Sequence, residues 1–310
     1  MQDVPPAAQR RLDLAAATVL YRPDPAVLDA LLAPLVEAGL RIVIFANGPL
    51  DDAIEARLAR LPNLHLTRSP SNVGLGVGLN AVVEAAQSEG FGHVVLFDQD
   101  STPDAALLPR LLDAFLATQA QPGLRPAAIA PLLVAPENEA FLPPWYSRRP
   151  KPPAEGVSAV DFLPTSGTLV SIPAWREVGP FRADYFIDGI DVEWCFRAWA
   201  KGFSCLLAEN LHMVHRWGYV AEEGKRQPQI LRQSDLRTFY YLRNAVEGLR
   251  LPHIPARWKL RVASRLALQC GLLLLHRKFG APTRRLLARA VSDGWTGRLG
   301  PAPVPLPSAQ

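Results

Sequence analysis

The chain has 310 residues, of which 49% are hydrophobic and 20% charged, and it contains no long low-complexity tract. This composition can bury a sizeable core and excludes a generally disordered chain. The net charge of +4 suits anionic substrates or a membrane surface. Nucleic acid is not expected as a partner, because no nucleic-acid motif or basic patch interleaved with aromatic residues is present.

The cysteines and the apolar runs predict a cytoplasmic protein. Cys195, Cys205 and Cys270 match no metal-binding spacing, and their odd number favours a reducing compartment. The first ten residues lack the apolar stretch of a signal peptide. The nearest candidate for a spanning helix, Leu266–Leu275, is shorter than the roughly 18 apolar residues that such a helix needs.

Strand and helix patterns alternate over the first half of the chain. In the first predicted helix, Asp24 can serve as cap, Pro25 suits the first position, Pro34 should kink the helix and Gly39 suits its end. Further helices are predicted at Asp52–Leu61, from the loop Ser71–Gly76 to about Ser88, and from Pro103–Asp104 to about Thr118. Buried strands are predicted at Leu14–Tyr21, Arg41–Phe45, Leu64–Thr67, His93–Phe97 and Ala127–Val134.

This alternation predicts an α/β fold with a Rossmann-like, mostly parallel central sheet and helices on both faces. In such sheets, ligands bind beyond the carboxyl ends of the strands. The turns after Tyr21, Phe45 and Phe97 lie at those ends, so three polar turns should meet at one crevice.

The second half of the chain is less regular. Residues 136–158 are rich in proline and arginine without a helical or strand period, which predicts a long loop over the site or a partly mobile flap. Asp188–Lys201 is predicted to be a helix, and the chain becomes helical and basic from Gln233. The expected organisation is a tail at 1–10, an α/β domain at 11–232, a helical region at 233–300 and a disordered tail at 301–310.

The turn Asp98-Gln99-Asp100, directly after the predicted strand His93–Phe97, is the strongest functional signal. Two carboxylates spaced by one residue can face one ligand, and Mg²⁺ or Mn²⁺ prefers oxygen ligands that it shares with substrate phosphates. An acidic surface turn is the alternative interpretation. The position after an all-apolar strand in an alternating fold favours a functional site.

Six motifs in a fixed order resemble those of family 2 inverting glycosyltransferases of GT-A fold, and most of all the rhamnosyltransferases. They are Thr18–Tyr21, Ser71–Gly74 with Asn80, Phe97–Ser101, Thr165–Thr168, Phe186–Trp194 and His215–Gly218, and Tyr240–Asn244 extends the match. The Asp-Gln-Asp-Ser form of the acidic turn is the feature that favours the rhamnosyltransferase branch.

The resemblance implies a GT-A catalytic domain with a C-terminal helical extension, and a role for each matching residue. Asp191 matches the catalytic base, and Asp98 would contact the ribose of the donor. The other implied donor-binding residues are Thr18, Tyr21, Asn47, Asn72 and Gln99. Asp100 and His215 would bind the metal, Mg²⁺ or Mn²⁺. Ser166, Gly167 and Glu193 would lie near the transferred sugar or the acceptor.

The physical case for Asp191 stands beside the resemblance. Asp191 lies in the first turn of a predicted helix, whose dipole favours a charged carboxylate. A well-placed base accelerates transfer by on the order of 10²–10⁴. Asp188 is expected to cap the same helix. Glu193 is either a second acid in the site or a structural partner of Arg197, and both interpretations stay open.

Two positions leave questions open. A lone histidine is more often structural than a ligand, and His212 lies three residues before His215, so spacing alone does not decide which of them binds the metal. Many relatives carry an aspartate where this chain has Ala46. Reading of the donor's base must then fall to backbone groups, Asn47 or another side chain, which leaves the base open.

The segment Trp258–Phe279 places basic side chains around an apolar run. It either lies at the inner leaflet of the membrane, where polyprenyl-linked acceptors reside, or packs as a core helix with a solvated basic face.

The sequence therefore predicts a metal-dependent transferase that moves a sugar, in the first place L-rhamnose from dTDP-β-L-rhamnose, to a hydroxyl of a surface-polysaccharide or lipid-linked glycan. Another nucleotide sugar, such as a UDP-hexose, is an alternative donor. Asp98–Thr102 also satisfies the Asp-x-Asp-x-Thr turn of haloacid-dehalogenase-type phosphatases, but that turn usually follows the first strand of the chain. A non-catalytic binding domain is disfavoured by the acids at positions 98, 100 and 191.

Overall fold

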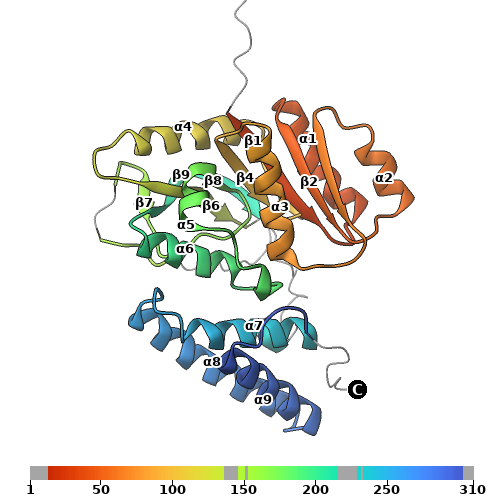
Figure 1. The fold of residues 1–310 in the computed structure, drawn as a ribbon, viewed down its shortest axis with the longest axis vertical. Helices are drawn as coiled ribbons and strands as arrows, with labels where there is room; N and C mark the ends of the chain where they lie inside the picture. The colour runs from red at the N-terminus through yellow and green to blue at the C-terminus, as the bar shows by residue number, and fades with distance from the viewer. Residues whose placement is uncertain (1–12, 136–145, 151–152, 216–228, 232, 303–310) are drawn as a thin grey trace, which may run out of the picture.

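The protein is a single mixed sheet covered by helices, with three further helices at its C-terminal end (Figure 1). The computed structural model describes residues 13–135, 146–150, 153–215, 229–231 and 233–302. The sheet has the strand order β3-β2-β1-β4-β8-β6-β9-β5, and β7 pairs with β9. The strands are β1 Leu14–Leu20, β2 Arg41–Asn47, β3 Leu64–Ser69, β4 His93–Phe97, β5 Ser101–Thr102, β6 Pro126–Val134, β7 Val157–Ala159, β8 Thr168–Ser171 and β9 Ser204–His215.

Six α-helices of the described chain accompany this sheet. They are α1 Pro25–Glu37, α2 Asp52–Leu58, α3 Leu75–Ser88, α4 Leu107–Gln119, α5 Ile172–Val178 and α6 Ile190–Ala200. The side chains of the strands alternate between two apolar cores, since Ala15 and Ala17 pack with α3, α5 and α6, whereas Leu14 and Ala16 pack with α1, α2 and α4. The expectation of helices on both faces of an α/β sheet is thereby confirmed.

The expected parallel pairing is found in both halves of the sheet. Strands β3, β2, β1 and β4 pair with one another in parallel, and so do β6 and β9, but β8 runs antiparallel to both β4 and β6. A parallel neighbour requires a long crossover, usually through a helix. Between β6 and β8 the described chain contains only the short strand β7 and turns, so the chain reverses direction. The sheet is therefore mixed, because β5, β7 and β8 add antiparallel pairs to the predicted parallel ones.

Local signals placed most element ends within a few residues. The Asp24 carboxylate accepts hydrogen bonds from the Ala26 and Val27 amides at the start of α1, as predicted, and the helix continues through Pro34. The largest shift is in α4, which begins at Leu107 instead of Pro103. Residues 101–102 are instead paired with β9 as strand β5, a long-range contact that local sequence does not report.

The C-terminal region consists of α7 Asp235–Gly248, α8 Ala256–His276 and α9 Ala281–Thr296, which share a small core of their own. Figure 1 shows them as a layer beside the sheet domain, with α7 the nearest to it. The Ala302 amide donates to the Tyr240 hydroxyl at 2.7 Å, and Ala302 is buried. Most of the expected tail 301–310, the N-terminal tail and most of the predicted loop 136–158 lie outside the described residues.

No helix within the described residues is long and apolar enough to cross a membrane.

Candidate active site

The predicted metal ligands are brought together in the structure. One ligand atom each from Asp98, Asp100 and His215 lie within 4.8 Å of one another. Strand pairing produces this cluster, because Ser101, directly after the acidic turn, is the antiparallel partner of His215 at the end of β9. Two carboxylate oxygens and an imidazole nitrogen form a donor set for a divalent cation, and the imidazole favours Mn²⁺ over Mg²⁺.

The structure distinguishes His215 from His212. Three residues apart on one strand, the two side chains point to opposite faces of the sheet, and only His215 is buried. A chain of two serine hydroxyls orients the His215 ring through its Nδ1 atom. Nδ1 lies 3.3 Å from Ser166 Oγ, and Ser166 Oγ lies 2.5 Å from Ser101 Oγ. This leaves Nε2 facing the acidic turn, at 4.0 Å from Asp98 Oδ2.

Ser166 and Gly167 support this cluster from the turn directly before β8. Ser166 is fully buried, so in the structure its hydroxyl orients His215. The Gly167 amide donates to the Leu96 carbonyl at 2.8 Å with φ at +76°. This left-handed backbone conformation favours glycine, and a Cβ at this position would also displace the flexible end of the Met213 side chain, whose Cε would lie 2.8 Å away.

The carboxylates around the cluster repel one another. Burial, together with the charges of Asp100 and Asp191, raises the pKa of Asp98 to about 7, while Arg237 acts in the opposite direction. Burial raises the pKa of Asp191 to about 6, against the hydrogen bond that its carboxylate accepts from the Val192 amide. The helix start was expected to favour the charged form of Asp191, but desolvation outweighs it. Burial also lowers the pKa of His215, which favours the neutral, metal-binding ring.

Gln99 ties the acidic turn to the end of β1. Its Oε1 accepts from the Tyr21 amide at 2.8 Å, and its Nε2 donates to the Tyr21 carbonyl at 3.2 Å. The Tyr21 side chain is 41% exposed. Within β1, Thr18 has a buried hydroxyl that finds no hydrogen-bond partner among the described residues. The first and fourth strands thus end at one edge of the sheet, as predicted.

Asn47 and Asn72 form the wall next to this edge. Asn47 Nδ2 donates to Asn72 Oδ1 at 3.0 Å, Asn47 Oδ1 accepts from the Val73 amide at 2.8 Å, and Asn72 Oδ1 also accepts from the Gly74 amide at 2.9 Å. Both side chains therefore shape the loop that leads into α3. Ala46 is completely buried at the end of β2.

The start of α6 differs from the prediction. Gly189 is the N-cap residue, so the expected capping by Asp188 was wrong. Asp188 has a left-handed backbone conformation with φ at +66°, and its carboxylate accepts from Arg237 of α7 at 3.2 Å instead. Asp191 keeps its predicted place in the first turn of the helix.

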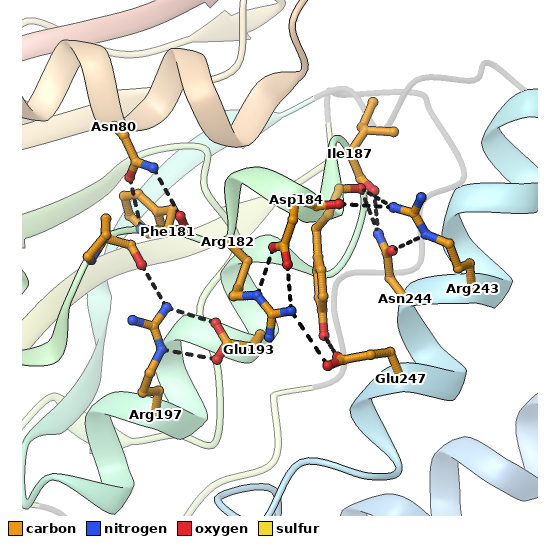
Figure 2. A network of polar contacts seen from close by, with 12 residues as sticks. Asn80, Phe181, Arg182, Asp184, Ile187, Glu193, Arg197, Arg243, Asn244 and Glu247 are labelled. Carbon is orange, nitrogen blue, oxygen red and sulfur yellow. Dashed lines mark hydrogen bonds and ion pairs between the residues drawn. The ribbon is translucent and has the colours of Figure 1, made fainter. Parts of the chain in front are cut away.

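Glu193 is engaged in ion pairs. Its carboxylate accepts two hydrogen bonds from Arg197, at 3.0 and 2.8 Å (Figure 2). It also lies 3.0 Å from His253 Nε2. Glu193 is 2% exposed. Of the two interpretations left open by the sequence, this geometry favours the structural partner of Arg197 over an acid that contacts the acceptor.

Two polar residues on α7 escaped the sequence-based assignment of roles. Arg243 and Asn244 are buried beside the segment that leads into α6. Both residues belong to the motif Tyr240–Asn244. The sequence could have indicated their importance, because an arginine and an asparagine on the buried side of a helix need hydrogen-bond partners.

Comparison with known proteins identifies the relatives of this chain. Residues 21–125 match the family model described as Glycosyl transferase family 2. The dTDP-rhamnosyl transferase RfbF of Shigella flexneri is 24% identical over 295 residues, which cover 92% of this chain and 96% of the relative. The N-acetylglucosaminyl-diphospho-decaprenol L-rhamnosyltransferase of Mycobacterium tuberculosis H37Rv is 25% identical over 292 residues, which cover 84% and 92%.

Solved structures show the same fold. TarS 1-349 of S. aureus in complex with UDP-GlcNAc superposes with a TM-score of 0.58 at 12% identity, over 91% of this chain and 80% of that one. GalNAc-T7 with UDP, GalNAc and Mn²⁺ gives a TM-score of 0.55 at 11% identity, over 84% of this chain but only 55% of that one. The predicted GT-A fold and the resemblance to rhamnosyltransferases are thereby confirmed.

Proposed function

We propose that this chain, a glycosyltransferase with a family 2 domain, moves L-rhamnose from dTDP-β-L-rhamnose to a hydroxyl of a surface-polysaccharide or lipid-linked glycan, with inversion at the anomeric carbon. The observation that carries the proposal is the cluster of Asp98, Asp100 and His215, with Asp191 close enough to perturb it. The names of two relatives support the donor and the acceptor, since one is a dTDP-rhamnosyl transferase and the other acts on a diphospho-decaprenol.

Asp100 and His215, with Asp98 beside them, would hold Mg²⁺ or Mn²⁺. The bound cation would neutralise the charge of the departing diphosphate. Asp98 would also contact the ribose, next to the wall formed by Asn47 and Asn72. The cluster of carboxylates supports this assignment, because the charges of Asp100 and Asp191 raise the pKa of Asp98 and an added cation would relieve that repulsion.

Asp191 is the proposed catalytic base. Its carboxylate would accept the proton of the acceptor hydroxyl while that oxygen attacks the anomeric carbon. A pKa of about 6 leaves Asp191 mostly charged at neutral pH and still basic enough to take a proton. Donor-side residues (Thr18, Tyr21 and Gln99) lie at the ends of β1 and β4, so the base and the nucleotide pocket come from different parts of the fold.

The decisive experiment combines a binding screen with one substitution. dTDP-rhamnose, and UDP-hexoses as the alternative donors left open by Ala46, are tested for thermal stabilisation with and without Mn²⁺. Asp191→Asn should abolish transfer while the Mn²⁺-dependent donor binding survives, and the exposed Asp113→Asn serves as the matched control. Loss of donor binding in Asp191→Asn would remove it from the role of base, and hydrolysis of a simple phosphate ester would favour the phosphatase.

The outer surface of the C-terminal helices supports a proposal about location, namely that the chain binds the cytoplasmic face of the inner membrane peripherally. Residues 256–298 contain ten lysines and arginines and one aspartate, although the whole chain has a net charge of only +4. Large apolar side chains are exposed on the same helices and just beyond α8, among them Leu260 at 74%, Leu268 and Leu275 at 64% and Phe279 at 53%. Basic groups beside exposed leucines are typical of helices that lie in the headgroup region of anionic membranes.

The segment Trp258–Phe279 combines features of both predicted arrangements, a helix at the membrane surface and a helix packed in a core. Leu266 and Leu273 of α8 are buried in the C-terminal core, while the opposite side of the helix is exposed. A second copy of the chain is a poorer occupant for this surface, because it would oppose two strongly basic faces.

Vesicle binding tests the location without requiring any transfer activity. The full chain should co-sediment with vesicles of equal parts phosphatidylglycerol and phosphatidylcholine, and far less with phosphatidylcholine alone. Replacing Leu260, Leu268 and Leu275 by Gln should lower the partition coefficient by ~10-fold or more, since each leucine inserts apolar surface. Leu116→Gln on α4, an exposed leucine outside this surface, is the control. Equal binding of the triple variant would refute the proposal.

A further inference from the structure

The segment 183–189, directly before α6, has an unusual backbone. Phe186 and Asp188 have φ at +66°, and Gly189 follows at +79°. Left-handed conformations of non-glycine residues cost of order 1–3 kcal/mol each and persist only where surrounding structure holds them. Asp191 lies two residues further on, in the first turn of the helix. The position of the proposed base therefore depends on a strained turn that needs external support.

Helix α7 provides that support through Asn244. Its Nδ2 group donates to the carbonyls of Tyr185 at 3.0 Å, Ile187 at 2.8 Å and Asp188 at 2.8 Å (Figure 2). The two N–H groups of one amide thus satisfy three carbonyls across the turn. Asn244 is 3% exposed, so the water that could replace these contacts is largely excluded.

Arg243 completes the contact. Its guanidinium donates to the carbonyls of Asp184 at 3.2 Å and Tyr185 at 3.0 Å, and its Nε donates to Asn244 Oδ1 at 3.0 Å. The last bond fixes which end of the amide faces the turn. Arg243 is 1% exposed, an unusual burial for a charged side chain, which indicates that its hydrogen bonds compensate for desolvation.

The other side of the turn faces the loop of the proposed donor pocket. The Leu75 amide donates to the Phe186 carbonyl at 2.6 Å, and a Cβ on Gly74 would lie 2.8 Å from the Phe186 ring. The Phe186 ring stacks on Tyr240 of α7, with ring centroids 4.8 Å apart. The turn is therefore held between the loop 71–76 and α7, with no freedom to relax on either side.

We propose that Asn244 and Arg243 are positioning residues that set the location of Asp191 by fixing the turn 183–189, so that the C-terminal helices form part of the catalytic apparatus. This inference rests on the proposed role of Asp191 as base. A displacement of about 1 Å of a catalytic group is enough to lower the rate by on the order of 10². Release of the turn should therefore act on turnover more than on donor affinity.

The test compares Asn244→Ala, Asn244→Asp and Leu273→Ala in the full chain. Asn244→Ala should lower kcat by ~10- to 100-fold and leave the KM for the donor within ~3-fold. Asn244→Asp, although nearly isosteric, should be worse than Asn244→Ala, because its carboxylate would face three carbonyl oxygens. Leu273→Ala removes buried apolar volume from the core that α7, α8 and α9 share and should keep kcat at any comparable loss of melting temperature.

The outcomes separate this inference from the proposed function. If Asn244→Ala melts earlier but keeps kcat at temperatures well below its transition, Asn244 is merely structural and the inference fails. If Asn244→Asp is milder than Asn244→Ala, side-chain volume and not hydrogen-bond donation matters, and the inference fails as well. If Asp191→Asn itself keeps full turnover, the assignment of the base fails, whatever the Asn244 variants show.

Discussion

Substitution of Glu193 by an uncharged residue distinguishes a structural role of this side chain, which affects stability, from a catalytic role, which affects turnover. The carboxylate is 2% exposed, accepts two hydrogen bonds from Arg197 and lies 3.0 Å from His253. Truncation of one partner of a buried ion pair costs about 3–5 kcal/mol. Arg197 keeps hydrogen bonds to the carbonyls of Val178 and Pro180. We therefore expect the loss of unfolding free energy in Glu193→Ala to lie near the lower end of this range, at about 3 kcal/mol.

A loss of about 3 kcal/mol corresponds to a fall in Tm of roughly 5–10 °C for a protein of this size. Differential scanning calorimetry measures the fall, and steady-state kinetics well below the transition measures turnover. Glu193→Gln, which keeps the shape, should lose less stability, and both variants should keep kcat within ~3-fold. A Glu193→Gln variant that is stable but at least 100-fold slower would refute the structural role and restore Glu193 to the acceptor site.

The pH dependence of stability provides a second check on Glu193. Hydrogen bonds from His253 and Arg197 together overcome the effect of burial and lower the pKa of Glu193 below its usual 4.5. A carboxylate with a lowered folded pKa stabilises the protein above its unfolded pKa, and this contribution is lost as the pH falls through the folded value. The difference in unfolding free energy between wild type and Glu193→Gln should therefore shrink below about pH 4.5. A constant difference would contradict the pairing.

Three further predictions address the base, the metal and the packing of α3. Because the charged form of Asp191 accepts the proton and its pKa is raised to about 6, kcat should fall as the pH is lowered through about 6, and a flat pH–rate profile in this region would exclude Asp191 as the base. Chelation of divalent cations, or Asp100→Ala, should abolish stabilisation by the donor in thermal-shift assays, whereas unchanged binding in Asp100→Ala would remove it from the metal site. Gly76→Ala should lower the free energy of unfolding, measured by urea titration, by about 1–3 kcal/mol, because its Cβ would lie 2.5 Å from the Arg182 carbonyl oxygen. Gly271→Ala lies in open space on α8 and should raise the free energy of unfolding by about 0.5–1 kcal/mol. Similar effects of the two substitutions would contradict the packing of α3.

Local sequence determined the elements whose signal is local. His93–Phe97 was predicted at its observed ends, because four apolar residues in a row follow His93 and the segment is bounded by Gly92 and Asp98. Asp24 and Pro25 marked the start of α1 for the same kind of reason. Strand β5 and the direction of β8 were not predictable in this way, since both depend on pairing with strands far away in the chain.

The candidate site also contains features that local sequence predicts and features that depend on long-range contacts. The acidic turn and the first-turn location of Asp191 follow from short motifs, and the structure brings Asp98, Asp100 and His215 together as expected. The contact of Ser166 with His215, the pairing of Asp188 with Arg237 and the amide of Asn244 against the turn are all tertiary contacts. The sequence pointed to Ser166, Asp188 and the motif that contains Asn244, but it could not predict which residues they contact.

The pairing of Ser101 with His215 also has a consequence for biosynthesis. Proteins emerge from the ribosome N-terminus first, and the acidic turn is made long before the strand that carries His215. A nascent chain that ends within β9 carries two of the three candidate ligands and the wall formed by Asn47 and Asn72, but not the imidazole. If these residues hold the cation as proposed, full affinity for it would arise only when β9 has joined the sheet, so chains truncated before His215 should bind it more weakly.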